Sequence, residues 1–393
     1  MKITKIEAIP YRMQGIDVLT GQPREGGWVS GLSKRSLQAG LKAQDIATTQ
    51  DVLVRIHTDE GIVGLGESVG PIGDIVWTIR EQIAPLLIGE DPTNTEKLLR
   101  KIDLARTAGG TTPFTTRVYI RTGVDIALHD ISAKALNVPL HKLLGGALTD
   151  KMVVNWTIYI RKPEKMAKEA GWVLEHGLAK EFIIKVGLDP KQDIENVAAV
   201  RKEVGDDVPI KVDANTAYSV ATAIRVAKQL EKHDVKYFEQ PVKGWDFFGL
   251  AEVARKVDIP VCGDESVVAP WTVMLLARLD AIKFISFKLP RYGGIYPSKR
   301  MTHVAESADI QICMSCSKCP FDSAIGSSAA LQFGASTTNA TPAYDYSTHW
   351  LIDDIVKEPL KVKNGYIYVP NKPGLGLEVD EKKLEKYKIK KTC

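Results

Sequence analysis

The chain has 393 residues, 44% hydrophobic and 25% charged, which is an ordinary globular composition with enough length for a large core. Its net charge of +4, from 52 lysines and arginines against 48 aspartates and glutamates, is too small to indicate a nucleic-acid-binding protein. It has no apolar stretch of transmembrane length and no signal-peptide pattern, and its five cysteines do not suggest a disulfide framework. We therefore expect a soluble cytoplasmic protein that binds neither nucleic acid nor membranes.

Residues 1–125 are predicted to form an α+β domain. An alternating strand pattern near 2–13 is followed by a Gly- and Ser-rich loop and then by two strand patterns, 51–58 and 62–68. The short turn between these two patterns is typical of a β-hairpin. Helical patterns follow at three places: 74–88, 93–106 and 118–138.

Residues 126–355 show a regular alternation of short apolar runs and helical segments. Eight runs are strand candidates: "MVVNWTIY", "EFIIKVG", "PIKVDAN", "KYFEQP", "IPVCGDES", "FISFKLP", "IQICMS" and "PAYDYS". Strands that alternate with helices indicate parallel β–α–β units, and this number of them favours a closed TIM-type barrel. Residues 356–393 return to strand and turn patterns with an Asn-Gly hairpin signal, so we expect them to rejoin the N-terminal domain.

Five consecutive predicted strands end in a charged residue: Lys185, Asp213, Glu239, Asp264 and Lys288. They are spaced by about one strand–helix unit, so a barrel would direct all five toward its C-terminal mouth, where barrel enzymes hold their chemistry. Three converging carboxylates repel one another unless a cation neutralises them. All-oxygen ligation suits a hard ion, so the pattern predicts a Mg²⁺ site, with Mn²⁺ as the alternative.

The two lysines beside this predicted metal site indicate proton transfer. A C–H group next to a carboxylate is a weak acid, so its removal requires a base and stabilisation of the resulting enediolate. Lys185 and Lys288 would lie across the barrel from each other and could reach opposite faces of one planar intermediate. This arrangement predicts racemisation or epimerisation.

Several segments, "GVDIALHDISAKALNVPLHKLLGG", "VDAN", "FEQP", "GDES" and "PNKPGLGLEVD", occur in an order that resembles the enolase superfamily, in particular its muconate-lactonizing-enzyme subgroup. The resemblance covers nearly the whole chain. It implies a modified (β/α)₇β barrel with an α+β capping domain formed by the N-terminal part and the C-terminal tail. It also implies capping loops, about 14–45 and 68–73, that close over a small carboxylate substrate. The site residues implied are the metal ligands Asp213, Glu239 and Asp264, with Asn215 and Glu265 supporting them.

Three positions depart from the family pattern, and we expect all three to contact substrate. Ile183 stands where the family has the first lysine of a Lys-x-Lys motif, on the same strand face as Lys185. Asp322 replaces the Glu of a Glu-Ser-x-Ile-Gly stretch. Asp345 stands alone where dipeptide epimerases carry Asp-x-Asp to hold an ammonium group.

We therefore expect an isomerase that removes the α-proton of a carboxylate substrate, with racemisation or epimerisation of an amino-acid derivative as the first hypothesis. The alternatives are a muconate-type cycloisomerase, a dehydratase of a hydroxy acid, and a non-catalytic ligand-binding barrel. We interpret the run Cys313, Cys316 and Cys319 as small packing residues rather than part of an iron–sulfur site, with a redox-sensitive or substrate-contacting thiol as the alternative. We also expect a homo-oligomer.

Overall fold

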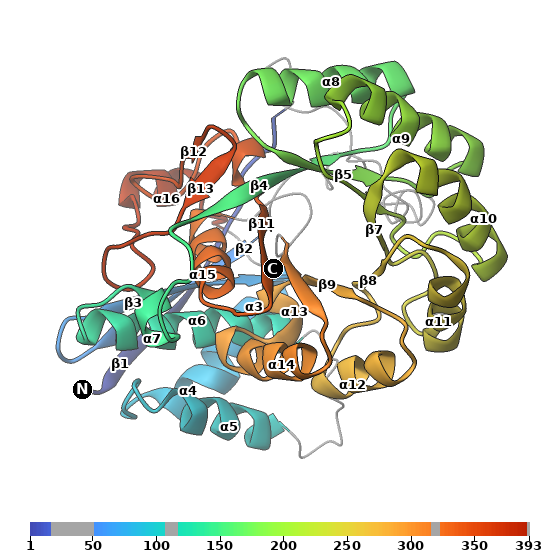
Figure 1. Ribbon diagram of the computed structural model, residues 1–393. Helices are drawn as coiled ribbons and strands as arrows, with labels where there is room; N and C mark the ends of the chain where they lie inside the picture. The colour runs from blue at the N-terminus through green and yellow to red at the C-terminus, as the bar shows by residue number, and fades with distance from the viewer. Residues whose placement is uncertain (17–50, 107–116, 316–322, 391–393) are drawn as a thin grey trace.

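A three-stranded antiparallel sheet in the order β1 (Ile3–Tyr11), β2 (Asp51–Thr58), β3 (Val63–Val69) forms the start of the fold. It belongs to a computed structural model that describes residues 1–16, 51–106, 117–315 and 323–390 (Figure 1). The predicted hairpin is confirmed by the pairing of β2 with β3. Most of the predicted loop at 14–45 lies outside the described residues.

Helices cover this sheet on one side. Residues 72–87 form α3 (Ile72–Trp77), a π-helical turn and α4 (Ala84–Leu87), and α5 (Thr95–Arg106) follows. The long helix α6 (Arg117–Ala135) packs directly on β3. This contact requires glycine, because a Cβ atom at Gly66 would overlap the carbonyl oxygen of Gly123 in α6. In the described part of the chain, no helix is long and apolar enough to cross a membrane.

Eight parallel strands close into a barrel, which confirms the predicted fold class (Figure 1). Seven helices connect them along the outside, and no such crossover follows the last strand among the described residues, as expected for a (β/α)₇β arrangement. In chain order the elements are β4 (Lys151–Ile158), α8 (Pro163–Glu175), β5 (Glu181–Lys185), α9 (Pro190–Val204), β6 (Ile210–Asp213), α10 (Val220–Leu230), β7 (Val235–Glu239), α11 (Phe247–Lys256), β8 (Val261–Gly263), α12 (Pro270–Arg278), β9 (Phe284–Phe287), α14 (Ile295–Ser307), β10 (Gln311–Met314), α15 (Ala324–Ala335) and β11 (Ala340–Asp345). The ring closes where β11 pairs with β4.

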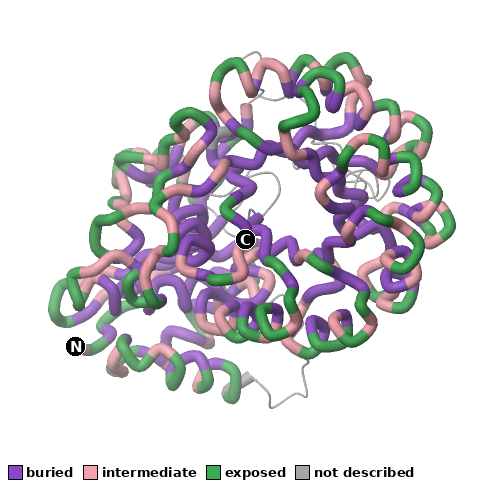
Figure 2. The backbone as a smooth tube through the Cα atoms, in the orientation of Figure 1, coloured by how far each residue is buried: buried purple, intermediate pink, exposed green. Residues whose placement is uncertain are grey.

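Local sequence explains where these helices begin. The side chain of Asp189 accepts hydrogen bonds from the first backbone amides of α9, and Pro190 occupies a position where its missing N–H is harmless. Ser219 and Asp246 cap α10 and α11 in the same way. The apolar faces of these helices pack on the barrel strands, whose residues are buried almost throughout, whereas the outer helix faces are exposed (Figure 2).

The C-terminal tail contacts both parts of the molecule. Its hairpin, β12 (Val362–Lys363) and β13 (Tyr366–Tyr368), turns at Asn364 and Gly365, which both have positive φ, and β13 pairs antiparallel with barrel strand β4. The last helix, α16 (Glu381–Tyr387), instead reaches the capping sheet, where Glu381 pairs with Arg55 of β2. The boundaries at 125/126 and 355/356 stay predictions, and the first of them falls within α6.

Candidate active site

One polar side chain stands at or beside the C-terminal end of every barrel strand: Thr157, Lys185, Asp213, Glu239, Asp264, Lys288, Ser315 and Asp345. We call these eight residues the strand-end ring. All are buried except Lys288, which is partly exposed. The five charged positions predicted from the strand spacing belong to this ring, and hydrogen bonds and ion pairs connect neighbouring members. The barrel therefore brings together the groups that the sequence separates by about one strand–helix unit each.

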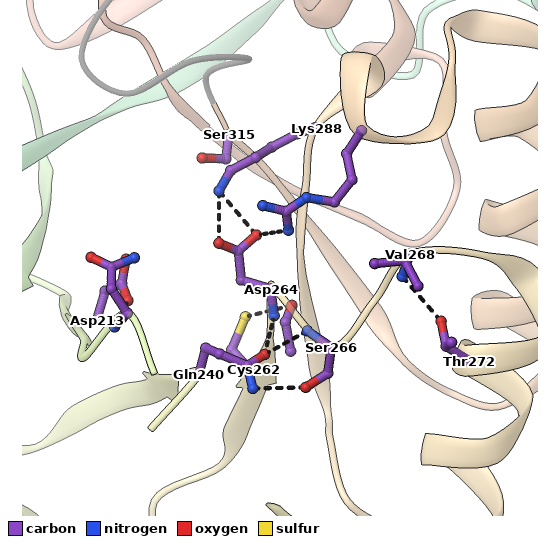
Figure 3. A network of polar contacts seen from close by, with 12 residues as sticks. Asp213, Gln240, Cys262, Asp264, Ser266, Val268, Thr272, Lys288 and Ser315 are labelled. Atoms are coloured by element: carbon purple, nitrogen blue, oxygen red, sulfur yellow. Dashed lines mark hydrogen bonds and ion pairs between the residues drawn. The ribbon is translucent and has the colours of Figure 1, made fainter. Parts of the chain in front are cut away.

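Ion pairs hold two of the three predicted metal ligands. Lys185 pairs with Asp213, its direct neighbour across β5 and β6. The Lys288 amine donates to both oxygens of Asp264, at 2.9 and 2.8 Å, and Arg291 pairs with the same carboxylate (Figure 3). Although burial alone would raise the pKa of Asp264, Arg291 and Lys288 together hold it well below its usual range. Asp264 is therefore ionised at neutral pH.

Glu239 lies on β7, between the strands that carry Asp213 and Asp264. Burial, followed by the charges of Asp213 and Asp264, raises the pKa of Glu239 well above its usual value. Its Oε2 atom is buried and has no hydrogen-bond partner among the described residues. The Oδ1 atom of Asn215 and both carboxylate oxygens of Glu265 are in the same situation, and burial with Asp264 raises the pKa of Glu265 to about 7. The site therefore has an excess of buried oxygen acceptors.

This donor set fits the chemistry of a hard divalent cation. Carboxylates at the ends of three adjacent strands, with unpartnered buried oxygens around them, are groups that such an ion would neutralise and bind. In the described ranges, no three His, Cys, Asp or Glu side chains are already arranged as a metal-binding group. In Figure 3, Asp264 is turned toward Lys288, and Asp213 lies apart from it. Arg291 also pairs with Asp264. Metal binding would therefore replace these ion pairs.

The opposite part of the strand-end ring is polar and carries one further acid. Asp345 accepts hydrogen bonds from Thr157 at 3.0 Å and from Ser315 at 3.3 Å. This places Asp345 across the barrel from the strands of the three carboxylates, because β11 and β7 lie four positions apart in a ring of eight strands. Asp345 remains a predicted substrate contact, and Asp322 lies outside the described residues.

Ile183 lies one layer deeper in the barrel than Lys185. It is 4% exposed and packs with Tyr237, Cys262 and Cys313 inside the strands. It therefore contributes an apolar layer beneath the strand-end ring, and its predicted contact with substrate stays a prediction. Cys313 belongs to this buried layer, while Cys316 and Cys319 lie outside the part of the chain that the structure describes.

Sequence reasoning missed Arg291, Thr157 and Ser315. Arg291 follows Lys288 by three residues on the one-turn helix α13 (Leu289–Tyr292), a spacing that brings both side chains to one face. That spacing was a usable signal. The two hydroxyl residues offered none, because Thr and Ser are common at strand ends for purely structural reasons.

Comparison with known proteins identifies the family. Residues 165–383 match the family model described as "Enolase C-terminal domain-like", and residues 37–145 match the mandelate racemase / muconate lactonizing enzyme N-terminal domain. The chain is 31% identical over 355 residues to an N-succinyl-L-Arg/Lys racemase of Bacillus cereus, covering 86% of this chain and 90% of that protein. It is 32% identical over 345 residues to an L-Ala-D/L-Glu epimerase of Clostridium acetobutylicum, covering 85% and 92%.

Solved structures agree with these sequence matches. A muconate lactonizing enzyme from Pseudomonas fluorescens superposes with a TM-score of 0.86 at 25% identity, over 99% of both chains. The relatives are racemases, epimerases and cycloisomerases, which confirms the predicted enzyme class, an isomerase. The chain belongs to the enolase superfamily, in its muconate lactonizing enzyme subgroup.

Proposed function

We propose that this protein is a Mg²⁺-dependent racemase or epimerase that removes and returns the α-proton of an amino-acid derivative. The observation that carries the proposal is the placement of Lys185 and Lys288 in the strand-end ring. Their strands, β5 and β9, lie four positions apart in either direction around a closed ring of eight. Two amines in these positions are suited to act on opposite faces of one planar intermediate held between them.

The three carboxylates occupy the arc between the two lysines. Asp213, Glu239 and Asp264 stand on β6, β7 and β8 and would hold the ion, with Asn215 and Glu265 beside them. Mg²⁺ bound there would draw charge from the substrate carboxylate and make its α-hydrogen more acidic. The substrate would then lie across the strand-end ring, with its α-carbon between the two lysine amines.

While its ion pair with Asp264 is intact, Lys288 is held in the ammonium form. Burial alone would lower the pKa of Lys288, but Asp264 outweighs burial and raises it. Metal binding would take Asp264 and Asp213 away from the two lysines and free both amines for proton transfer. Lys185 would then serve as the base for the enantiomer whose α-hydrogen faces β5, with Lys288 as the proton donor. Racemisation in the opposite direction requires the reverse assignment, so each lysine must be able to hold and release a proton.

Support for an amino-acid derivative comes from Asp345. Its carboxylate lies on the side of the barrel away from the three predicted metal ligands and would attract a cationic group at the far end of a substrate. The similarity to a racemase of N-succinylated arginine and lysine and to a dipeptide epimerase points the same way. Muconate-type cycloisomerisation is the second candidate, favoured by the close structural match to muconate lactonizing enzyme.

Incubation with Mg²⁺ in D₂O tests the proposal. N-acylated amino acids, dipeptides, muconates and hydroxy acids would be supplied, and deuterium at the α-carbon would be followed by NMR together with optical rotation. We expect deuterium incorporation with inversion for an amino-acid derivative. Lactone formation from muconate would favour the cycloisomerase, and loss of water would indicate a dehydratase. A metal-loaded protein that exchanges no α-hydrogen in any of these compounds would contradict the proposal and favour a non-catalytic binding barrel.

A further inference from the structure

Gln240 follows Glu239 at the end of β7 and has an unusual environment for a glutamine. It is fully buried, with no exposed surface. Its backbone has a φ of 34°, in the left-handed region that non-glycine residues rarely adopt. A buried amide in such a conformation is costly unless its hydrogen bonds compensate for it.

The side chain of Gln240 uses its full hydrogen-bonding capacity on the loop that carries Asp264. Its Oε1 atom accepts from the backbone N–H groups of Asp264 at 2.9 Å and Ser266 at 3.0 Å. Its Nε2 atom donates to the Ser266 hydroxyl at 2.7 Å (Figure 3). It also donates to the carbonyl oxygen of Val242 at 3.1 Å. Two acceptor positions and two donors are thereby all occupied.

The backbone of Gln240 extends these connections to both neighbouring strands. Its N–H donates to the carbonyl oxygen of Cys262 on β8 at 2.9 Å, and its carbonyl oxygen accepts from the N–H of Thr216 at 2.8 Å. Thr216 lies in the loop after β6, three residues beyond Asp213. Gln240 therefore joins the three chain segments that carry Asp213, Glu239 and Asp264.

We propose that Gln240 is a positioning residue that sets the distances between these three carboxylates and thereby the affinity for the divalent ion. This inference rests on the metal site of the proposed function. Gln240 itself would touch neither the ion nor the substrate. It acts through the backbone of Asp264, whose N–H donates to its side chain, and through its backbone hydrogen bonds to Cys262 on β8 and to Thr216 in the loop after β6. Replacing a group that orients a metal ligand typically lowers metal affinity by about 10- to 100-fold.

The test is calorimetric titration of Mg²⁺ into the purified, substrate-free protein, with unfolding temperatures measured in EDTA. Gln240→Met keeps the size of the side chain and removes its polar contacts, and we expect it to weaken Mg²⁺ binding about tenfold or more. Ser266→Ala removes one of those contacts and leaves the bond to the Asp264 N–H, so about a threefold loss is expected. This second variant is mild enough to report on the idea if Gln240→Met does not fold.

Gln332→Met is the matched control. Gln332 is also fully buried, in α15, where its Oε1 accepts from His141 N–H and its Nε2 donates to Ser328 and Gly374. Its replacement should lower the unfolding temperature in EDTA while leaving Mg²⁺ affinity within about twofold of wild type. Wild-type Mg²⁺ affinity in both Gln240→Met and Ser266→Ala would overturn this inference but not the proposed metal site. An equal loss of Mg²⁺ affinity in Gln332→Met would do the same. If the wild-type protein binds no Mg²⁺, both the proposed metal site and the inference about Gln240 are overturned.

Discussion

Replacing Asp354 by asparagine should change how the stability of the protein depends on pH. Asp354 accepts hydrogen bonds from the backbone N–H groups of Ala324 at 2.8 Å and Val356 at 3.2 Å, and it is almost completely buried. Burial, with a contribution from the nearby Glu67 carboxylate, raises its pKa to about 7 despite these hydrogen bonds. The group joins the start of α15 to the segment after the barrel, close to the end of capping strand β3.

The sign of the effect follows from proton binding. The unfolded chain loses the Asp354 proton near its ordinary pKa of about 3.9, whereas the folded protein keeps it until about pH 7. The folded state therefore binds more protons in this interval, and its stability falls as the pH rises from about 4 to 7. At about 1.4 kcal/mol for each pKa unit, the part of this loss between pH 5 and pH 8 is roughly 2.5 kcal/mol.

Urea unfolding of the metal-free protein at pH 5 and pH 8 measures this quantity. Between pH 5 and pH 8 the wild type should lose roughly 2.5 kcal/mol of unfolding free energy that Asp354→Asn does not lose. The variant should therefore gain that much stability relative to wild type at pH 8. Asp258→Asn, at an exposed position, controls for the change in net charge. The same difference at both pH values would refute the assignment of a protonated, buried Asp354.

Other changes have effects that follow directly from packing and charge. Lys211→Met should lower the unfolding free energy by about 3 kcal/mol or more, because Lys211 is buried and pairs with Glu181 at 2.6 Å, leaving that carboxylate poorly compensated. Equal stability of variant and wild type in urea would contradict this. Gly66→Ala should cost about 3 kcal/mol or more through overlap with α6, whereas Gly61→Ala, in an open turn with positive φ, should cost about 1 kcal/mol. Thermal unfolding of the two variants compares them directly.

The barrel and its strand-end ring were predictable because both depend on regular patterns. Strand and helix periods alternate from β4 to β11, and a charged residue after each of five successive strands must meet the others once the ring closes. Local turn chemistry was equally readable: the Asn364-Gly365 hairpin forms where the sequence signals it.

Contacts that depend on side-chain placement were not predictable in this way. Nothing in "FEQP" indicates that the amide of Gln240 binds the backbone of the next strand's loop, because that loop is 24 residues away in sequence. The pairing of β13 with β4 was missed for a similar reason, since hairpin patterns do not specify which sheet edge they join. The charge on Arg291 was visible, but its pairing with Asp264 depends on the short helix α13 that follows β9.

The central claim, that Lys185 and Lys288 act on opposite faces of one substrate, is tested most directly with single-lysine variants and separated enantiomers. Deuterium exchange in D₂O with Mg²⁺ would be measured for wild type, Lys185→Ala and Lys288→Ala. Each enantiomer of the substrate that the D₂O incubation identifies would be tested separately. We predict that neither variant interconverts the enantiomers, and that each still exchanges the α-hydrogen of one enantiomer, the opposite one in the two variants. Exchange of both enantiomers at the wild-type rate in both variants, or loss of the same enantiomer in each, would contradict the account.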